Sequence, residues 1–406
     1  MIESNFFRGN RQTLRDELDL QKDDLVLIPS AVRMQFHSEQ AAEFLQESNF
    51  FYLTGINEPD CLLMMSSKSE WLLIPKQDQF ASLWEGQLTP EEAKKKSEIE
   101  HVIDVEEGWS LLGRYIPNRV KRVFLLQPEP TIISGGIYTN PSQRDLLNQL
   151  QADFPLVSYV DVRPHLSEKR IIKQKPELTA IRRAVDVTLN TMNEVFKDLK
   201  SGRFEYELSA QLTYGFKKHG AQGDAYESIV AGGERACVIH YSKKDQTLQK
   251  NNFVLIDAGA RFDNYAADIS RTYLVEGKVS TRQQEILDAV DEVHTFALNY
   301  LKPGVRFDQY EEAVEAEMGR VLKNLKLIND VSRDSIRNYY PHATSHFLGL
   351  EVHDVGDRSA EFREGMVLTV EPGIYIPEES IGVRFEDNIL ITATGIENLS
   401  KELPLT

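Results

Sequence analysis

Four carboxylates and one histidine, each inside an apolar segment, constrain this chain more than any other feature. They lie in the segments LIDAG, AADISRTY, HATSHFLGLEVHD, VEPGIY and GVRFEDN, as Asp257, Asp268, His346, Glu371 and Glu386. A buried carboxylate is costly unless a positive group lies beside it. The pattern therefore predicts a buried site that contains positive charge, and we expect a pair of divalent metal ions as its source.

The first two carboxylates are predicted to lie on neighbouring strands of one hairpin. Residues 253–258 and 265–275 have the composition of strands, and a polar turn separates them. If the turn spans four residues, Asp257 faces Asp268 directly. If only residues 263–264 form a tight turn, Asp268 moves to the diagonal position. In both cases the alternation of side chains places the two carboxylates on one face of the sheet.

The last two carboxylates repeat this arrangement. The segments MVLTVEPGIYI and IGVRFEDNILIT flank residues 377–380, and this register places Glu371 opposite Glu386. Two like charges at such a distance would not both stay ionised without a cation. Two matched pairs in apolar flanks, with a histidine segment between them, favour a metal site over isolated carboxylates in contact with solvent.

Length, charge and cysteine content limit the class of protein. The 406 residues suffice for two domains with their own cores. The net charge of −17 argues against nucleic acid as the main partner. No run approaches the roughly 20 apolar residues of a membrane span, and the first residues lack the apolar stretch of a signal peptide. We expect Cys61 and Cys237, in different predicted domains, to be free thiols, and the protein to be cytoplasmic.

The N-terminal residues 1–168 are predicted to form a smaller α/β domain. Five segments have the composition of strands: DDLVLIPSA, NFFYLTGI, CLLMMSS, EWLLIP and RVFLLQP. Helices are expected over residues 38–46 and Pro90–Ser97. The charged, proline-bounded residues 164–176 are the predicted link to the second domain.

Residues 172–406 are predicted to form an α+β domain in which helices cover an antiparallel sheet. An amphipathic helix is expected over 176–199, where apolar residues recur at three- and four-residue steps. A second helix is expected over 281–301, with Thr281 and Gln284 in capping-box spacing, and a third over 307–325.

The carboxylate and histidine segments resemble those of the pita-bread metallopeptidases, which include methionine aminopeptidase, prolidase and aminopeptidase P. In that family the order Asp, Asp, His, Glu, Glu binds a dinuclear metal centre, and all five positions are present here in that order. The resemblance implies a catalytic pita-bread domain over 172–406 and an accessory domain of the creatinase and aminopeptidase P kind over 1–168.

The resemblance also implies a role for each metal ligand. Asp268 and Glu386 would bridge both ions, Asp257 would bind one ion, and His346 and Glu371 would bind the other. Carboxylates and one imidazole suit Mn, Co, Fe or Zn, and resemblance to aminopeptidase P favours manganese. Such a pair would hold a bridging water or hydroxide, and Glu371 is the candidate general base.

Further residues of these segments are candidates for proton transfer. His240 and His353 match histidines of the family that contact substrate and shuttle protons, and His342 matches a third on the product side. Arg384 lies two residues before Glu386, and we expect it to orient ligand carboxylates through charge-assisted hydrogen bonds.

Two aromatic residues are candidates for substrate binding. Tyr375 in VEPGIY either contributes a hydroxyl to the pocket or only packs. Trp84 in LWEGQ matches an aminopeptidase P segment whose tryptophan reaches the pocket of a neighbouring subunit, and a homodimer or homotetramer is therefore expected.

The segments SNFFYLTGINEPD and SHFLGLEVHD resemble aminopeptidase P more than prolidase. The leading interpretation is an Xaa-Pro aminopeptidase, which hydrolyses the N-terminal bond of peptides with proline at the second position. A prolidase restricted to Xaa-Pro dipeptides is the alternative within the same class. A catalytically dead pita-bread module that binds peptides is the alternative outside it, and the presence of all five ligands argues against that alternative.

Overall fold

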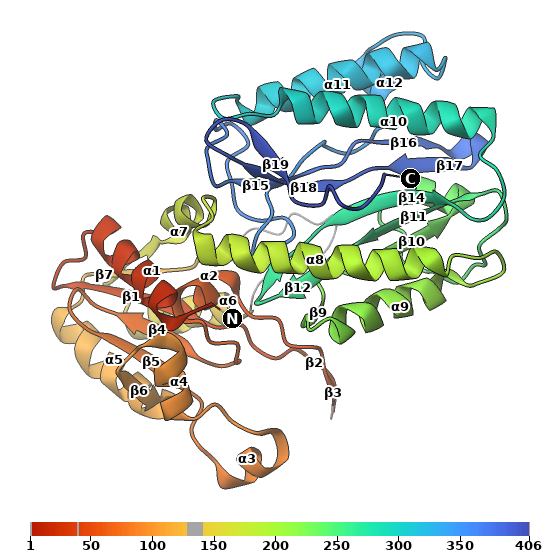
Figure 1. Ribbon diagram of the computed structural model, residues 1–406. Helices are drawn as coiled ribbons and strands as arrows, with labels where there is room; N and C mark the ends of the chain where they lie inside the picture. Colours follow the sequence, from red (N-terminus) through yellow and green to blue (C-terminus); the bar gives the residue numbers. More distant parts are fainter. Residues whose placement is uncertain (1, 39, 128–140, 406) are drawn as a thin grey trace. The chain divides into compact units, whose positions relative to one another are not determined.

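Residues 2–38, 40–127 and 141–405 are described by the computed structural model. The chain divides into two compact units, Met1–Lys169 and Arg170–Thr406, and both contain helices and strands (Figure 1). The expected α+β class is confirmed. None of the described helices is long and apolar enough to span a bilayer.

A six-stranded mixed sheet with the order β6-β5-β4-β1-β7-β8 forms the centre of the N-terminal unit. Its strands are β1 Asp24–Pro29, β4 Leu62–Met65, β5 Glu70–Ile74, β6 His101–Asp104, β7 Arg122–Leu125 and β8 Ser158–Asp161. The helices of the unit are α1 Ser4–Glu17, α2 Ser48–Thr54, α3 Gln79–Glu85, α4 Pro90–Ser97, α5 Val105–Arg119, α6 Pro141–Asp153 and α7 Arg163–Arg170. Four of the five predicted strands and the predicted helix Pro90–Ser97 are confirmed.

Two local predictions in this unit were wrong. The segment NFFYLTGI, expected to be a strand, forms α2 instead. The side chain of Glu47 accepts a hydrogen bond from the backbone of Phe50, and Gly55 ends the helix with a φ of 68°. Residues 49–54 are all buried, so the segment lacks the periodicity that identifies a helix.

The helix expected over residues 38–46 does not form in the described part of that range, which excludes residue 39. Strand β3 Gln40–Ala41 pairs there with β2 Gln35–His37. The boundary between the two units, Lys169–Arg170, lies within the predicted link 164–176, and α7 and the start of the next helix occupy most of that link.

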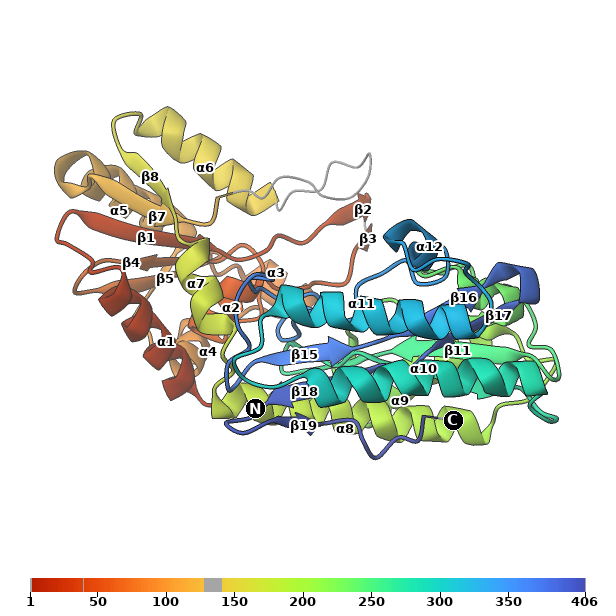
Figure 2. The same ribbon diagram turned by 90° about the horizontal axis from the view of Figure 1, so that it is seen from above.

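Two pairs of helices enclose the strands of the C-terminal unit. Figures 1 and 2 show α10 with α11 on one side of the strands and α8 with α9 on the other. The helices are α8 Lys175–Lys197, α9 Glu205–Lys218, α10 Thr281–Tyr300, α11 Phe307–Asn324 and α12 Arg333–Arg337. The three helices predicted in this unit are confirmed, and helices α10 and α11 supply much of the apolar core under the strands.

The capping box of α10 lies one residue earlier than predicted. Ser280 accepts from the backbone of Gln283, and the side chain of Gln283 accepts in turn from the backbone of Ser280. The sequence STRQQ satisfies the capping pattern at two neighbouring positions, so spacing alone did not separate them.

The first carboxylate hairpin has the tighter of the two predicted turns. Asp263 and Asn264 both have positive φ, 47° and 65°, and form a two-residue turn between β12 Ala260–Phe262 and β13 Tyr265–Ala266. Beyond it, β11 Phe253–Ala258 pairs with β14 Ile269–Leu274 so that Asp257 lies opposite Ser270. Asp268 is therefore diagonal to Asp257, as the second alternative predicted.

The second hairpin has the predicted register throughout. Strand β15 Val367–Val370 pairs with β18 Asp387–Ile391, and β16 Gly373–Ile376 pairs with β17 Ile381–Arg384. The partners Val370–Asp387 and Gly373–Arg384 belong to one continuous register, which places Glu371 opposite Glu386 in the interruption between the two ladders. The remaining strands of the unit are β9 Gly223–Asp224, β10 Ile229–Gly232 and β19 Ile396–Asn398.

Candidate metal centre and active site

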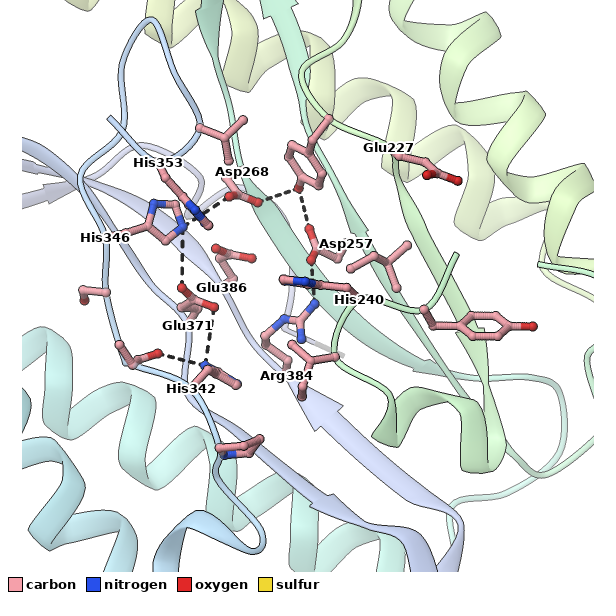
Figure 3. Close-up of a pocket in the computed structure, with 18 of the residues that line it drawn as sticks. Glu227, His240, Asp257, Asp268, His342, His346, His353, Glu371, Arg384 and Glu386 are labelled. Carbon is pink, nitrogen blue, oxygen red and sulfur yellow. Dashed lines mark hydrogen bonds and ion pairs between the residues drawn. The ribbon is translucent and has the colours of Figure 1, made fainter. Parts of the chain in front are cut away.

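All five predicted ligands line one cavity of about 760 Å³ within the C-terminal unit (Figure 3). The three other candidate histidines and the candidate arginine line the same cavity. Its wall thus includes Asp257, Asp268, His346, Glu371, Glu386, His240, His342, His353 and Arg384. Nine of the eleven side chains that the sequence proposed for the site therefore line this cavity.

The ligands occupy strand ends and strand interruptions. Asp257 lies near the end of β11, and Asp268 immediately precedes β14. Glu371 and Glu386 occupy the gap between the two ladders of the second hairpin. At these positions the adjoining strand pairing holds the backbone in place, and the carboxylates project from the sheet into the same cavity.

His346 presents its lone pair to the carboxylates. Its Nδ1 lies 3.1 Å from the carbonyl oxygen of Phe347, so the proton is on Nδ1. Its Nε2 lies 3.4 Å from Asp268 Oδ2 and 3.5 Å from Glu371 Oε1. A backbone carbonyl that fixes the tautomer in this way is the usual outer partner of a metal-binding histidine.

The carboxylates are crowded enough to raise the pKa of three of them above its ordinary value. Burial raises the pKa of Asp268, and the charge of Asp257 adds to it. Burial likewise raises the pKa of Glu371 and of Glu386, and the charge of a neighbouring carboxylate raises each pKa further. A divalent cation reverses this cost because it favours the ionised form of every neighbour.

The donor set fits such a cation. Ligand atoms of Asp268, His346 and Glu386 all lie within 4.8 Å of one another, and all three residues are buried. Asp257 and Glu371 extend this group along the cavity wall. Oxygen ligands with one imidazole suit hard and borderline divalent metals.

Arg384 is the centre of a buried hydrogen-bond network on the Asp257 side of the cavity. Its Nη2 donates to Asp257 Oδ2 at 2.5 Å, and its Nε donates to Ser270 Oγ at 2.8 Å. Ser270 in turn donates to Glu386 Oε2 at 2.7 Å. The guanidinium thus contacts one predicted ligand directly and a second through a hydroxyl.

Tyr375 connects the arginine to His342. Arg384 Nη1 donates to the hydroxyl oxygen of Tyr375 at 2.9 Å. His342 Nδ1 donates to the carbonyl of Ala343, so its Nε2 accepts the Tyr375 proton at 2.8 Å. Burial, with the nearby charge of Arg384, lowers the pKa of His342 to about 3. The hydroxyl of Tyr375 thus joins two residues that line the cavity, Arg384 and His342.

His353 and Trp84 have different surroundings. The ring of His353 lies 4.2 Å from that of His346, and burial lowers its pKa to about 4. Trp84 lies on α3 in the N-terminal unit, where 73% of it is exposed. The cavity is lined by residues of the C-terminal unit.

Sequence reasoning missed residues that support the ligands. The hydroxyl of Tyr226 contacts Asp257 Oδ1 and lies 2.5 Å from Asp268 Oδ1. The carboxylate of Glu311 accepts from the backbone of Thr344 and Ser345, at 2.9 Å each, immediately before His346. Neither residue lies in a ligand segment, so nothing in the spacing of those segments indicated it.

Comparison with known proteins places this geometry in a family. The metallopeptidase family M24 matches residues 179–393, and the aminopeptidase P N-terminal domain matches residues 7–124. An Xaa-Pro aminopeptidase of Haemophilus influenzae is 32% identical over 95% of this chain and 92% of its own length.

Two solved structures of Escherichia coli aminopeptidase P cover the whole of this chain and 96% of their own, each 31% identical. One, with the inhibitor Pro-Leu, has a TM-score of 0.89, and the other, zinc-substituted and in complex with product, has a TM-score of 0.88. The family match covers more than half of the chain and includes all five ligand positions. This chain belongs to metallopeptidase family M24.

Proposed function

We propose that this protein is a metal-dependent aminopeptidase that hydrolyses the N-terminal Xaa-Pro bond of peptides. The observation that carries the proposal is the joint presence of the five-ligand cavity and an aminopeptidase P N-terminal domain in one chain. The N-terminal domain favours an aminopeptidase over a prolidase. The intact ligand set argues against a catalytically dead binding module.

We propose that the site holds two divalent ions, with manganese as the native metal. Asp268 and Glu386 would bridge the ions, Asp257 would complete one site, and His346 and Glu371 would complete the other. When bound, such ions activate water and stabilise negative charge on the attacked carbonyl oxygen. The crowding of ionisable carboxylates around the His346 lone pair supports this assignment.

The protein's own groups would control proton movement around that reaction. We assign Glu371 as the general base, because its buried carboxylate lines the cavity beside the other four ligands. His240 and His353 would contact substrate and pass protons to the leaving proline nitrogen. Arg384 would hold the carboxylate of Asp257 in place through its 2.5 Å contact.

The chemistry of proline explains the need for a dedicated enzyme. A proline nitrogen carries no N–H once it is in a peptide bond, so a site shaped for its ring accepts a bond that most aminopeptidases cleave poorly. We further propose that peptides with proline at the second position are the partners, and that the protein is cytoplasmic. Its two cysteines are free thiols, which suits a reducing compartment.

The exposed Trp84 suits a contact between subunits, and we propose a homodimer or homotetramer in which it contributes to substrate binding. Sedimentation analysis of the wild type and of Trp84→Ala would test this assembly, and a monomeric wild-type protein would contradict it.

The experiment that decides the function compares Xaa-Pro-Yaa peptides with Xaa-Pro dipeptides at matched concentration and with manganese added. We expect cleavage of the Xaa–Pro bond in the longer peptides at a rate at least equal to that in dipeptides. Cleavage of dipeptides alone would indicate a prolidase. Absence of cleavage by a protein that binds two metal ions would indicate a binding module.

A further inference from the structure

We infer that Glu205 and Tyr241 are positioning residues that hold His240 at the cavity wall; this inference rests on the proposed function of that cavity. His240 lines the cavity and points into it (Figure 3). Among the described residues its ring has no hydrogen-bond partner, and the residue is exposed. The position of the imidazole therefore depends on how its backbone is held.

Glu205, the first residue of α9, is the anchor of that backbone. The residue is fully buried, at 0% exposure. Its Oε1 accepts from the backbone of Gly232 at 2.8 Å and from Arg235 Nε at 2.7 Å. Its Oε2 accepts from the hydroxyl of Tyr241 at 2.9 Å. Charged acceptors with several donors make the stronger class of hydrogen bond, and losing a partner there is costly.

These contacts surround the segment that carries His240 on both sides. Gly232 ends β10, and Arg235 lies in the short 3-10 helix Gly233–Cys237 that leads to His240. Tyr241 follows His240 directly, and beyond it the backbone of Glu205 donates to the carbonyl of Gln246 at 2.9 Å. One buried carboxylate thus fixes the segment before and immediately after the histidine.

Tyr241 is the residue through which the anchor acts on His240. Its ring is buried and packs with Ile229, Ala231 and Leu255, so only its hydroxyl is engaged by Glu205. Substitution Tyr241→Phe removes that one hydrogen bond and keeps the ring. Tyr265→Phe is a matched control, because the hydroxyl of Tyr265 donates to another buried carboxylate, Glu177 Oε1, at 3.0 Å.

The decisive test is a double-mutant cycle with His240→Ala, using an Xaa-Pro-Yaa peptide and manganese. We expect Tyr241→Phe to lower kcat by roughly 10-fold in the His240 background, a size consistent with one hydrogen bond to a charged group. In the His240→Ala background we expect the same substitution to change kcat less than about twofold, because non-additivity marks residues that act together. Equal losses in both backgrounds, or no loss in either, would overturn the inference.

A second measurement does not depend on catalysis. Amide hydrogen exchange of residues 238–242 should be faster in Tyr241→Phe than in the wild type, and unchanged in Tyr265→Phe. Glu205→Gln keeps an oxygen for Gly232 and Arg235, so it should loosen the segment less than Glu205→Ala. If Tyr241→Phe leaves hydrogen exchange in this segment unaltered, the inference is overturned, whether or not the wild type cleaves Xaa-Pro peptides. A wild type that is inactive on these peptides would refute only the proposed function.

Discussion

Removal of a single hydroxyl, in Tyr226→Phe, tests the electrostatic account of the metal site. The hydroxyl lies between Asp257 and Asp268, at 2.5 Å from Oδ1 of the latter. Burial and the two carboxylate charges raise the pKa of Tyr226 well above its ordinary value, so the group stays protonated and donates. This donor favours the ionised form of Asp268, against burial and the charge of Asp257, which raise the pKa of Asp268.

The size of the effect follows from this bond. A hydrogen bond to a charged acceptor contributes about 1.5–3 kcal/mol. Metal binding needs ionised carboxylates, so loss of the donor should cost a comparable amount, or roughly 10- to 100-fold in metal affinity. Loss of an outer partner of a metal ligand has a similar cost in general. Because the defect lies in ionising a carboxylate whose pKa is raised, it should grow as pH falls from about 7.5 to 6.

Titration calorimetry with Mn²⁺ at both pH values is the assay, with kcat/KM at saturating metal as a second readout. Tyr375→Phe is the control, because the hydroxyl of Tyr375 contacts Arg384 and His342 and, among the described residues, no carboxylate. We expect the control to keep its metal affinity within about threefold. Wild-type affinity of Tyr226→Phe at pH 6 would refute the reasoning, since the carboxylates would then be ionised without this donor.

Three further outcomes are expected. Asp268→Ala and Glu386→Ala should each abolish peptidase activity and lower the metal content measured by elemental analysis; near-normal activity with two ions bound would contradict the ligand assignment. His240→Ala and His353→Ala should keep both ions and lower kcat by roughly 10², the scale of a positioned proton-transfer group, whereas metal loss would show that either is a ligand. Burial raises the pKa of Glu177 to about 7 from 4.5, so its contribution to stability is present below pH 4.5 and is lost as pH rises through 7. Urea unfolding should therefore show that the free energy of unfolding of Glu177→Gln rises relative to that of the wild type between pH 5 and 8, by on the order of 3 kcal/mol. Parallel pH profiles of the two proteins would contradict this.

The sequence by itself determined the registers that create the site. Strand side chains alternate with a period of two, so a turn centre fixes which residues face each other. This was enough to place Glu371 opposite Glu386 and to restrict Asp257 and Asp268 to two arrangements. The long helices were equally predictable, because α8, α10 and α11 are each apolar on one face and cover the strands.

Local sequence was insufficient where tertiary burial removed the periodic signal. The apolar segment of α2 is buried on all sides, so it lacks the polar face that distinguishes a helix from a strand. The sequence also left open which of two turns the first hairpin has. The positive φ of Asp263 and Asn264 in the structure identifies the two-residue turn. In both cases the sequence pattern was compatible with two local structures, and tertiary packing determined which of them forms.

The partners of the site residues were decided only by the tertiary structure. Tyr226 reaches Asp257 across 31 residues, Arg384 reaches Asp257 across 127, and Glu205 reaches Tyr241 across 36. Spacing rules describe neighbours within one element or one hairpin, whereas these bonds join elements that come together only in the folded chain. A buried charge must find a partner somewhere in the fold, and the three-dimensional packing of the strands and helices determines which side chain is near enough to supply it.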